Sequence, residues 1–145
     1  MAERPLYFPD LGTSCQIGEG PDVRAVGWLD KAHPYPRGAV PAGFYTKLKE
    51  FADDPLQPIL FFGCHECELC FWRRYAECKN LWIPAARVIY LAPAMITHYI
   101  KRHRYKPPEE FVEAVFRCPR QGSPEFMGSM RPYMHYWRPK PVGER

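Results

Sequence analysis

Apolar residues in this chain fall into short runs separated by proline, glycine and aspartate, and no run approaches the roughly 18 residues needed to cross a bilayer. Four of the runs are bounded by turn-forming residues and have the β-branched and aromatic composition of strands. Two of them flank the pair Ala85-Ala86 and are expected to form a hairpin. The predicted strands are residues 23–29, 58–62, 81–84 and 87–91.

Three other segments space their apolar residues by three and four positions, which puts one apolar stripe on an amphipathic helix. A further helical turn or two is expected between Phe71 and Glu77. Prolines and acidic residues mark where the three helices begin and stop. The predicted helices start near Pro41, with Phe44, Leu48 and Phe51 buried; at Pro93, with Met95, Ile96, Tyr99 and Ile100; and at Pro108 or Glu109, with Phe111, Val112, Val115 and Phe116.

Residues 1–22 and residues 119–145 show neither pattern. We expect the first to be an extended arm docked by Leu6-Tyr7-Phe8, and the second to be an irregular aromatic and basic tail packed on the domain. The 17 prolines among 145 residues are about twice the usual ~5% share, which requires many loops and short elements. The sequence therefore predicts a small single α+β domain over residues 1–145, with about four short strands, three helices and an irregular C-terminal tail.

The composition, with 46% hydrophobic and 25% charged residues, is that of a globular chain. The net charge of +4 is concentrated in residues 101–106 and in the C-terminal tail, and it is too small to indicate a nucleic-acid partner. The first residues lack the apolar core of a signal peptide. We therefore expect a cytoplasmic protein without a membrane partner.

Residues 63–70 (Gly-Cys-His-Glu-Cys-Glu-Leu-Cys) hold three of the six cysteines and one of the five histidines. In a reducing compartment, such crowding is more typical of metal or redox chemistry than of disulfide stapling. Thiolates two residues apart, such as those of Cys67 and Cys70, can both turn onto one zinc ion about 2.3 Å from each sulfur. His65 extends the pattern to H-x-C-x2-C, so this segment predicts a zinc knuckle.

A structural zinc site takes four ligands, so at least one must come from outside this segment. Cys67 and Cys70 with His98 and His103 form the pattern C-x2-C…H-x4-H. Residues five apart on a regular helix point about 140° away from each other, so both histidines converge only if the helix loosens at its end. We therefore favour one remote histidine. The favoured ligands are His65, Cys67, Cys70 and His98, and the next candidates are Cys64, His103, Cys78 and Cys118.

Other chemistries are open to the same cysteines. C-x2-C-x2-C begins the iron–sulfur run of bacterial ferredoxins, but Arg74 stands where the next cysteine would be, which leaves the remote Cys118-Pro119. An apolar strand leading into Cys64-His65-Glu66-Cys67 is the layout of a thioredoxin-like active site, although a third thiol at Cys70 could trap the wrong disulfide. Buried thiols without any ligand are the remaining alternative.

Three blocks of this sequence carry a family resemblance. They are Val26-Gly27-Trp28-Leu29-Asp30 with His33 and Phe44; His65-x-Cys67-x2-Cys70; and Pro93 through His98-Tyr99-Ile100-x2-His103-x-Tyr105-x-Pro107-Pro108-x2-Phe111. Together they resemble a family of small uncharacterised bacterial proteins described as a domain of unknown function. The resemblance implies a compact domain that binds zinc through the second block, with His65 favoured over Cys64. The resemblance also strengthens the case for His98 and His103 as metal ligands, because both lie in the third block.

The sequence contains no Ser/His/Asp layout, no phosphate-binding glycine loop and no helical H-E-x2-H motif. The enzymatic route that is left is a zinc ion with one position open to water, with Glu66 or Glu68 as the base. We expect instead a structural zinc in a protein-interaction or regulatory module. Its partner surface is expected to comprise the proline-rich loop at 33–41, the basic turn at 101–106 and the aromatic tail.

Overall fold

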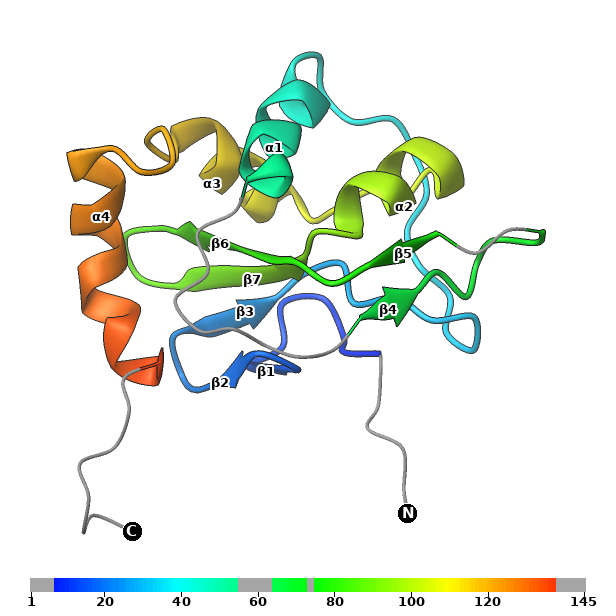
Figure 1. Ribbon diagram of the computed structural model, residues 1–145, viewed down its shortest axis with the longest axis horizontal. Helices are drawn as coiled ribbons and strands as arrows, with labels where there is room; N and C mark the ends of the chain where they lie inside the picture. The colour runs from blue at the N-terminus through cyan, green and yellow to red at the C-terminus, as the bar shows by residue number, and fades with distance from the viewer. Residues whose placement is uncertain (1–6, 55–63, 73–74, 138–145) are drawn as a thin grey trace, which may run out of the picture.

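The computed structural model of the protein describes residues 7–54, 64–72 and 75–137. These residues form an α+β fold, as the sequence predicts. The first three helices lie along one side of a small central sheet, and the C-terminal helices stand at one end of it (Figure 1). Among the described residues, none of the helices is long and apolar enough to cross a membrane. The elements are β1 (Ser14–Cys15), β2 (Gly18–Glu19), β3 (Val23–Ala25), α1 (Phe44–Asp53), β4 (His65–Glu66), β5 (Ala76–Glu77), β6 (Asn80–Pro84), β7 (Ile89–Pro93), α2 (Ile96–His103), α3 (Glu109–Arg117), α4 (Pro124–Met130) and the 3-10 helix η1 (Arg131–Trp137).

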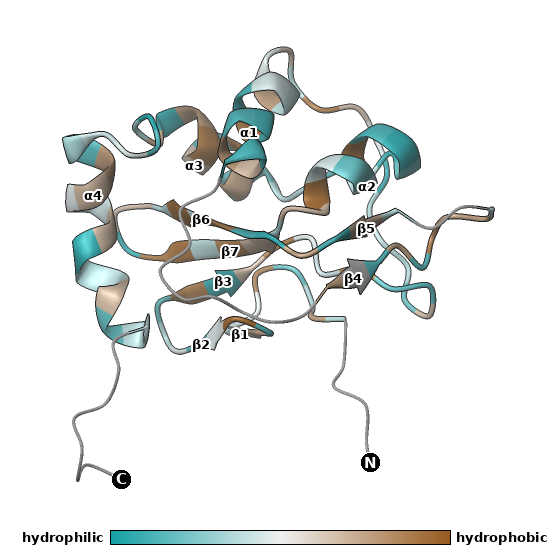
Figure 2. Ribbon diagram, viewed as in Figure 1, coloured by the Kyte–Doolittle hydropathy of each residue, from teal (hydrophilic) through white to brown (hydrophobic). Residues whose placement is uncertain are grey.

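The central sheet has the strand order β3-β7-β6. β6 and β7 form the predicted antiparallel hairpin, with Pro84 at its end opposite Ile89. β3 lies parallel to β7, and Val23 faces Ile89 in the register. Every residue of β6 and β7 is buried, which explains why both strands are almost continuously apolar (Figure 2).

All three predicted helices form, and α1 and α2 bury their whole predicted stripes, which for α2 are Met95, Ile96, Tyr99 and Ile100. In α1 the buried side chains include Phe44, Leu48 and Phe51, and α1 packs against both α2 and α3. In α3 the predicted side chains of Phe111, Val112 and Val115 are buried. The predicted burial of Phe116 is wrong, because this ring is 42% exposed. Phe116 lies off the stripe and only touches the core through an edge contact with Phe44, at 6.0 Å between ring centroids.

The segment that follows the cysteine-rich stretch differs from its prediction. Ala76–Glu77 forms β5 and pairs antiparallel with β4, in place of the expected helical turn. The long-range pairing overrides the weak local helix preference, because the backbone N–H of Cys67 donates to the carbonyl of Tyr75 at 2.7 Å. The strand predicted at residues 58–62 lies outside the described residues.

The N-terminal segment docks through an aromatic side chain and then turns back on itself. Phe8 forms a backbone bridge with Trp28, and the two rings meet edge to face at 5.9 Å. Farther along, β1 and β2 form a short antiparallel hairpin. The carboxylate of Asp10 accepts hydrogen bonds from the Gly27 backbone at 3.1 Å and from the Tyr105 hydroxyl at 2.8 Å. This segment is therefore part of the folded domain.

The C-terminal segment is helical over residues 124–137, in place of the irregular tail expected there. Ser123 caps α4 by accepting a hydrogen bond from the Phe126 N–H at 3.1 Å, and Pro124 occupies the first turn. Ser-Pro-Glu is a recognisable helix start, so this signal was present in the sequence. The indole of Trp137 then donates to the Ile17 carbonyl at 3.0 Å, which ties this segment to the β1–β2 turn.

We predict that Trp137→Ala lowers the unfolding free energy by about 3–5 kcal/mol, because it removes a buried ring that packs edge to face on Trp82. Urea unfolding followed by circular dichroism measures this change. Met127→Ala is the matched control on an exposed site of α4 and should change stability by no more than about 0.5 kcal/mol. Equal effects of the two substitutions would show that the C-terminal helices are not part of the cooperative core.

Candidate metal centre

The β4–β5 hairpin sets the positions of four of the six cysteines. Its register pairs His65 with Glu77 and Glu66 with Ala76, which brings Cys64 opposite Cys78. These two cysteines form a disulfide at the base of the hairpin. Cys67 and Cys70 stand beyond the paired residues, in the turn. The disulfide therefore separates one cysteine pair from the two thiols that are left free in this segment.

The two free thiols of the turn meet two histidines from α2. The ligand atoms of Cys67, Cys70, His98 and His103 all lie within 4.8 Å of one another. His98 Nε2 lies 3.2 Å from the Cys70 sulfur. His103 Nε2 lies 3.4 Å from the Cys67 sulfur and 3.5 Å from the Cys70 sulfur. We call these four residues the Cys2His2 cluster.

These three sulfur-to-nitrogen separations are close to the edge of a tetrahedron around a single ion. With zinc–sulfur bonds of about 2.3 Å and zinc–nitrogen bonds of about 2.0 Å, the sulfur-to-nitrogen edge is about 3.5 Å. Hydrogen bonds alone explain the arrangement less well. The Nε2 of His103 carries either one N–H or one lone pair, so it can make one direct hydrogen bond, yet it lies near both sulfurs. The donor set therefore fits a mononuclear Cys2His2 metal ion.

The two histidines converge because α2 is loosened at its end. The N–H of Arg104 donates to the carbonyl of Tyr99, five residues back, and Arg104 itself adopts a left-handed conformation with φ 57°. A wider last turn brings residues five apart towards one face, as a regular turn would not. The rings of His98 and His103 accordingly lie 5.1 Å apart between centroids.

Burial sets the protonation of the cluster before any metal is considered. Desolvation, with the neighbouring charges of His103 and Arg102, lowers the pKa of His98 to about 4, and desolvation also lowers the pKa of His103. Both rings are therefore neutral at neutral pH and have a free lone pair for a metal. Desolvation raises the pKa of Cys67 to about 11. A coordinating thiol is deprotonated outright, so metal binding here would release a proton.

Neighbouring groups hold the histidines in place. The Tyr75 ring stacks on His98, with 4.5 Å between centroids and 9° between planes. The hydroxyl of Tyr35 donates to the backbone carbonyl of His103 at 3.0 Å. The first contact joins the hairpin to α2, and the second joins the end of α2 to the proline-rich loop.

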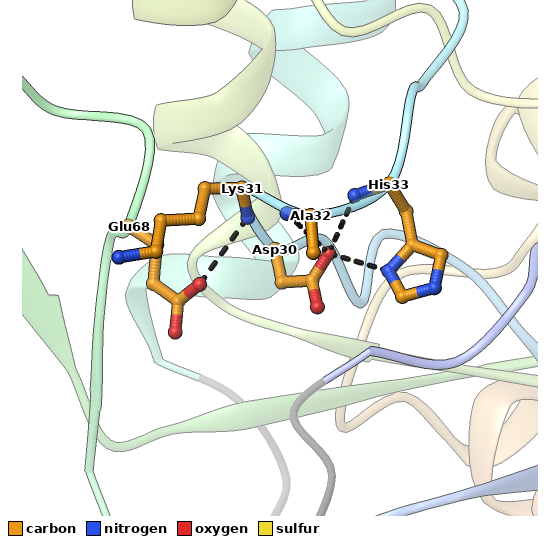
Figure 3. A network of polar contacts seen from close by, with 5 residues as sticks. All are labelled: Asp30, Lys31, Ala32, His33 and Glu68. Carbon is orange, nitrogen blue, oxygen red and sulfur yellow. Dashed lines mark hydrogen bonds and ion pairs between the residues drawn. The ribbon is translucent and has the colours of Figure 1, made fainter.

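A polar network attaches the turn to the loop that precedes α1 (Figure 3). Glu68 accepts from the Lys31 backbone N–H at 3.2 Å. Asp30 accepts from the backbone N–H groups of Ala32 and His33 and lies 2.7 Å from the His33 ring nitrogen Nδ1. The Asp30–His33 pair resembles half of a catalytic triad. The same carboxylate oxygen closes a local turn, however, which explains the contact without catalysis.

The structure brings three of the four favoured ligands together, namely Cys67, Cys70 and His98, and joins them to the next candidate His103. The side chain of His65 lies outside the described part of the structure. Cys64 and Cys78 are joined to each other, so they offer no thiolate while their disulfide is intact. Cys118 is buried at the end of α3 and is not in the cluster.

Comparison with known proteins places the chain in a family. The family model described as Domain of unknown function (DUF7919) matches residues 6–116. The chain belongs to this family. The DUF7919 match includes all four residues of the Cys2His2 cluster and stops before α4. No curated protein and no solved structure matches the chain.

We predict that alkylation of the unfolded, metal-free and unreduced protein modifies four of its six cysteines. The protected pair should be Cys64 and Cys78, because the β4–β5 register holds them opposite each other. Peptide mass mapping identifies the modified positions, and reduction before alkylation should expose all six. Modification of Cys64 without prior reduction would contradict the pairing.

Proposed function

We propose that this protein is a zinc-binding module in which one structural zinc ion, held by Cys67, Cys70, His98 and His103, fixes a surface for a protein partner. The convergence of these four side chains carries the proposal. Two thiolates and two imidazoles in tetrahedral array are a donor set that suits zinc. The ligands come from the hairpin turn and from α2, so the ion would lock these elements together.

A structural role is favoured over a catalytic one because the protein itself offers four ligands. Catalytic zinc sites generally keep three protein ligands and leave the fourth position to water or substrate. Of the two glutamates that could act as a base, Glu68 already accepts from the Lys31 backbone. We therefore favour a binding module over a zinc hydrolase.

The same geometry argues against the two other chemistries of the cysteines. A thioredoxin-like site would pair Cys64 with Cys67, whereas Cys64 is bonded to Cys78. A two-iron cluster with two cysteine and two histidine ligands binds the cysteines on one iron and the histidines on the other. Here each imidazole lies within 3.5 Å of a sulfur, which suits one shared ion.

Contacts between the proline-rich loop and the basic turn support the proposed partner surface. The Gly38 N–H donates to the Arg104 carbonyl at 3.0 Å, and the Lys106 N–H donates to the Pro36 carbonyl at 2.9 Å. A hollow of about 540 Å³ beside these contacts is lined by both apolar and charged residues, namely Ala39, Val40, Pro41, Lys106, Pro107, Glu109, Val112 and Glu113. The aromatic residues at the C-terminus are less suited to a partner, since Phe126, Tyr133 and Trp137 are buried.

We predict that the purified protein contains about one zinc ion per chain and that Cys67→Ser, Cys70→Ser or His103→Ala removes it. Because binding free energy at a structural site is also folding free energy, each substitution should lower stability by about 3–4 kcal/mol. Elemental analysis and urea unfolding measure the two effects. His135→Ala is the matched control, because it removes an exposed histidine outside the cluster. A brown protein with acid-labile sulfide would reject zinc in favour of iron–sulfur.

His65 provides a second comparison within the same experiment. If the Cys2His2 cluster holds the metal, His65→Ala should retain the zinc that His103→Ala loses. Loss of zinc from His65→Ala together with retention in His103→Ala would assign the fourth position to His65 instead.

We also predict that zinc removal loosens the proposed partner surface. Hydrogen exchange at the amides of Gly38 and Lys106 should speed up by about tenfold or more when a chelator strips the ion, because Arg104, which accepts from Gly38, and Lys106, which donates to Pro36, both follow the anchored end of α2. The amide of Val26, which donates to the Leu91 carbonyl inside the core, is the internal control. Unchanged exchange at Gly38 after metal loss would separate the ion from this surface.

A further inference from the structure

The turn between β4 and β5 carries two aromatic side chains that project from the protein. Phe71 is 99% exposed and Trp72 is 84% exposed. The exposed large apolar residues elsewhere in the described chain, Phe116 and Met127, are only 42% and 40% exposed. Two adjacent rings left in water indicate a surface that contacts something else. We call Phe71 and Trp72 the aromatic tip.

The aromatic tip is anchored on both sides. Cys70, the residue before it, belongs to the Cys2His2 cluster. Tyr75, a few residues after it, stacks on His98 and accepts a hydrogen bond from the Cys67 N–H. Both ends of the turn are thus tied to α2, so the tip is presented on an ordered base.

Basic side chains are exposed at the end of α2 to which the tip is anchored. Lys101, Arg102 and Arg104 are exposed at the C-terminal end of α2. This hydrophilic end lies at the same end of the molecule as the β4–β5 turn (Figure 2), and the contact between Cys70 and His103 joins the two. In the sequence the tip is also followed directly by two arginines. Of the acidic residues of the hairpin, Glu66 and Glu77 lie on its strands. Glu68 lies in the turn, three residues before the tip, and its carboxylate accepts from the Lys31 backbone N–H.

The size and charge of this surface distinguish between its potential occupants. Two aromatic side chains supply about 300–500 Å², which is less than the roughly 800 Å² that each partner contributes to a standard protein interface. A second copy would also bring the same positive charges together. Single-stranded nucleic acid is bound in basic grooves that follow its backbone, whereas this tip projects. A bilayer needs no complementary pocket, accepts aromatic rings at headgroup level and attracts basic residues when its lipids are anionic.

We propose that the aromatic tip and the basic end of α2 form a peripheral attachment site for an anionic membrane surface. Phe71 and Trp72 insert at the level of the headgroups, while Lys101 and Arg102 face the lipid charges. The expectation of no membrane partner rested on the lack of a spanning segment and of the apolar core of a signal peptide, and neither is needed for attachment of this kind. The site shares Lys101 and Arg102 with the basic turn at 101–106, but it does not include the hollow beside the proline-rich loop.

Trp72 gives a direct readout. The chain has four tryptophans, and Trp28, Trp82 and Trp137 are buried, at 2%, 1% and 5% exposure. The zinc-loaded full chain is mixed with vesicles of phosphatidylcholine alone or with about 30 mol% phosphatidylserine. We expect the tryptophan emission to shift to the blue, and the protein to sediment, with the anionic vesicles alone. Salt at about 0.5 M should weaken this binding severalfold.

Two sets of variants separate the aromatic and basic contributions. Phe71→Ser with Trp72→Ser should weaken vesicle binding about a hundredfold or more, as judged by sedimentation. Lys101→Gln with Arg102→Gln should weaken it by about fivefold per charge. The matched control, Phe116→Ser with Met127→Ser, removes exposed apolar surface elsewhere and should bind like the wild type. Zinc content is measured on every variant.

Several results would overturn this inference. They are an absence of vesicle binding by the zinc-replete chain, equal binding to neutral and anionic vesicles, or full binding by the tip variant. Quenching of Trp72 by a single-stranded oligonucleotide without vesicle binding would assign the tip to nucleic acid. A dimer that the tip variant loses, without vesicle binding, would assign it to a second copy. If the wild-type protein purifies without zinc and still binds anionic vesicles, the result contradicts the proposed zinc function and leaves the membrane site supported.

Discussion

The meeting of four side chains between the β4–β5 turn and the end of α2 is the contact on which this part of the fold depends. β4 and β5 pair over only two residues each, and such a short, exposed ribbon has little stability of its own. Besides the Tyr75–His98 stack and the Glu68–Lys31 hydrogen bond, its attachment to the domain is the meeting of Cys67 and Cys70 with His98 and His103. A metal ion bound at this point would take the place of the hydrophobic core that the hairpin lacks.

The loosened last turn of α2 links this contact to the rest of the surface. It turns His103 towards the sulfurs, while the His103 carbonyl accepts from Tyr35 in the proline-rich loop. One backbone distortion therefore serves two connections. A regular helical end would point His103 away from His98, and the cluster would then be short of one ligand.

The sequence predicts local elements well where one periodicity dominates. The spacing of Phe44, Leu48 and Phe51 fits only a helix, and the two apolar runs around Ala85-Ala86 fit only a hairpin. The structure contains both elements. The cysteine-rich stretch is harder because its partners are set by pairing between strands. Nothing in the spacing of Cys64 and Cys78 indicates that they lie opposite each other, since this depends on the β4–β5 register. The convergence of His98 and His103 likewise depends on a nonstandard helix end, which regular helix geometry cannot supply.

The parallel pairing of β3 with β7 has a consequence for the order of folding. β6 and β7 are neighbours in the chain and can meet as soon as both exist, whereas Ala25 must find Leu91 across most of the domain. Closing so long a loop costs entropy before any contact repays it. During synthesis the N-terminal strand leaves the ribosome long before its partner does, so its apolar side chains stay unpaired until β7 emerges. The β6–β7 hairpin is therefore the expected early structure, and docking of β3 beside it the slower step.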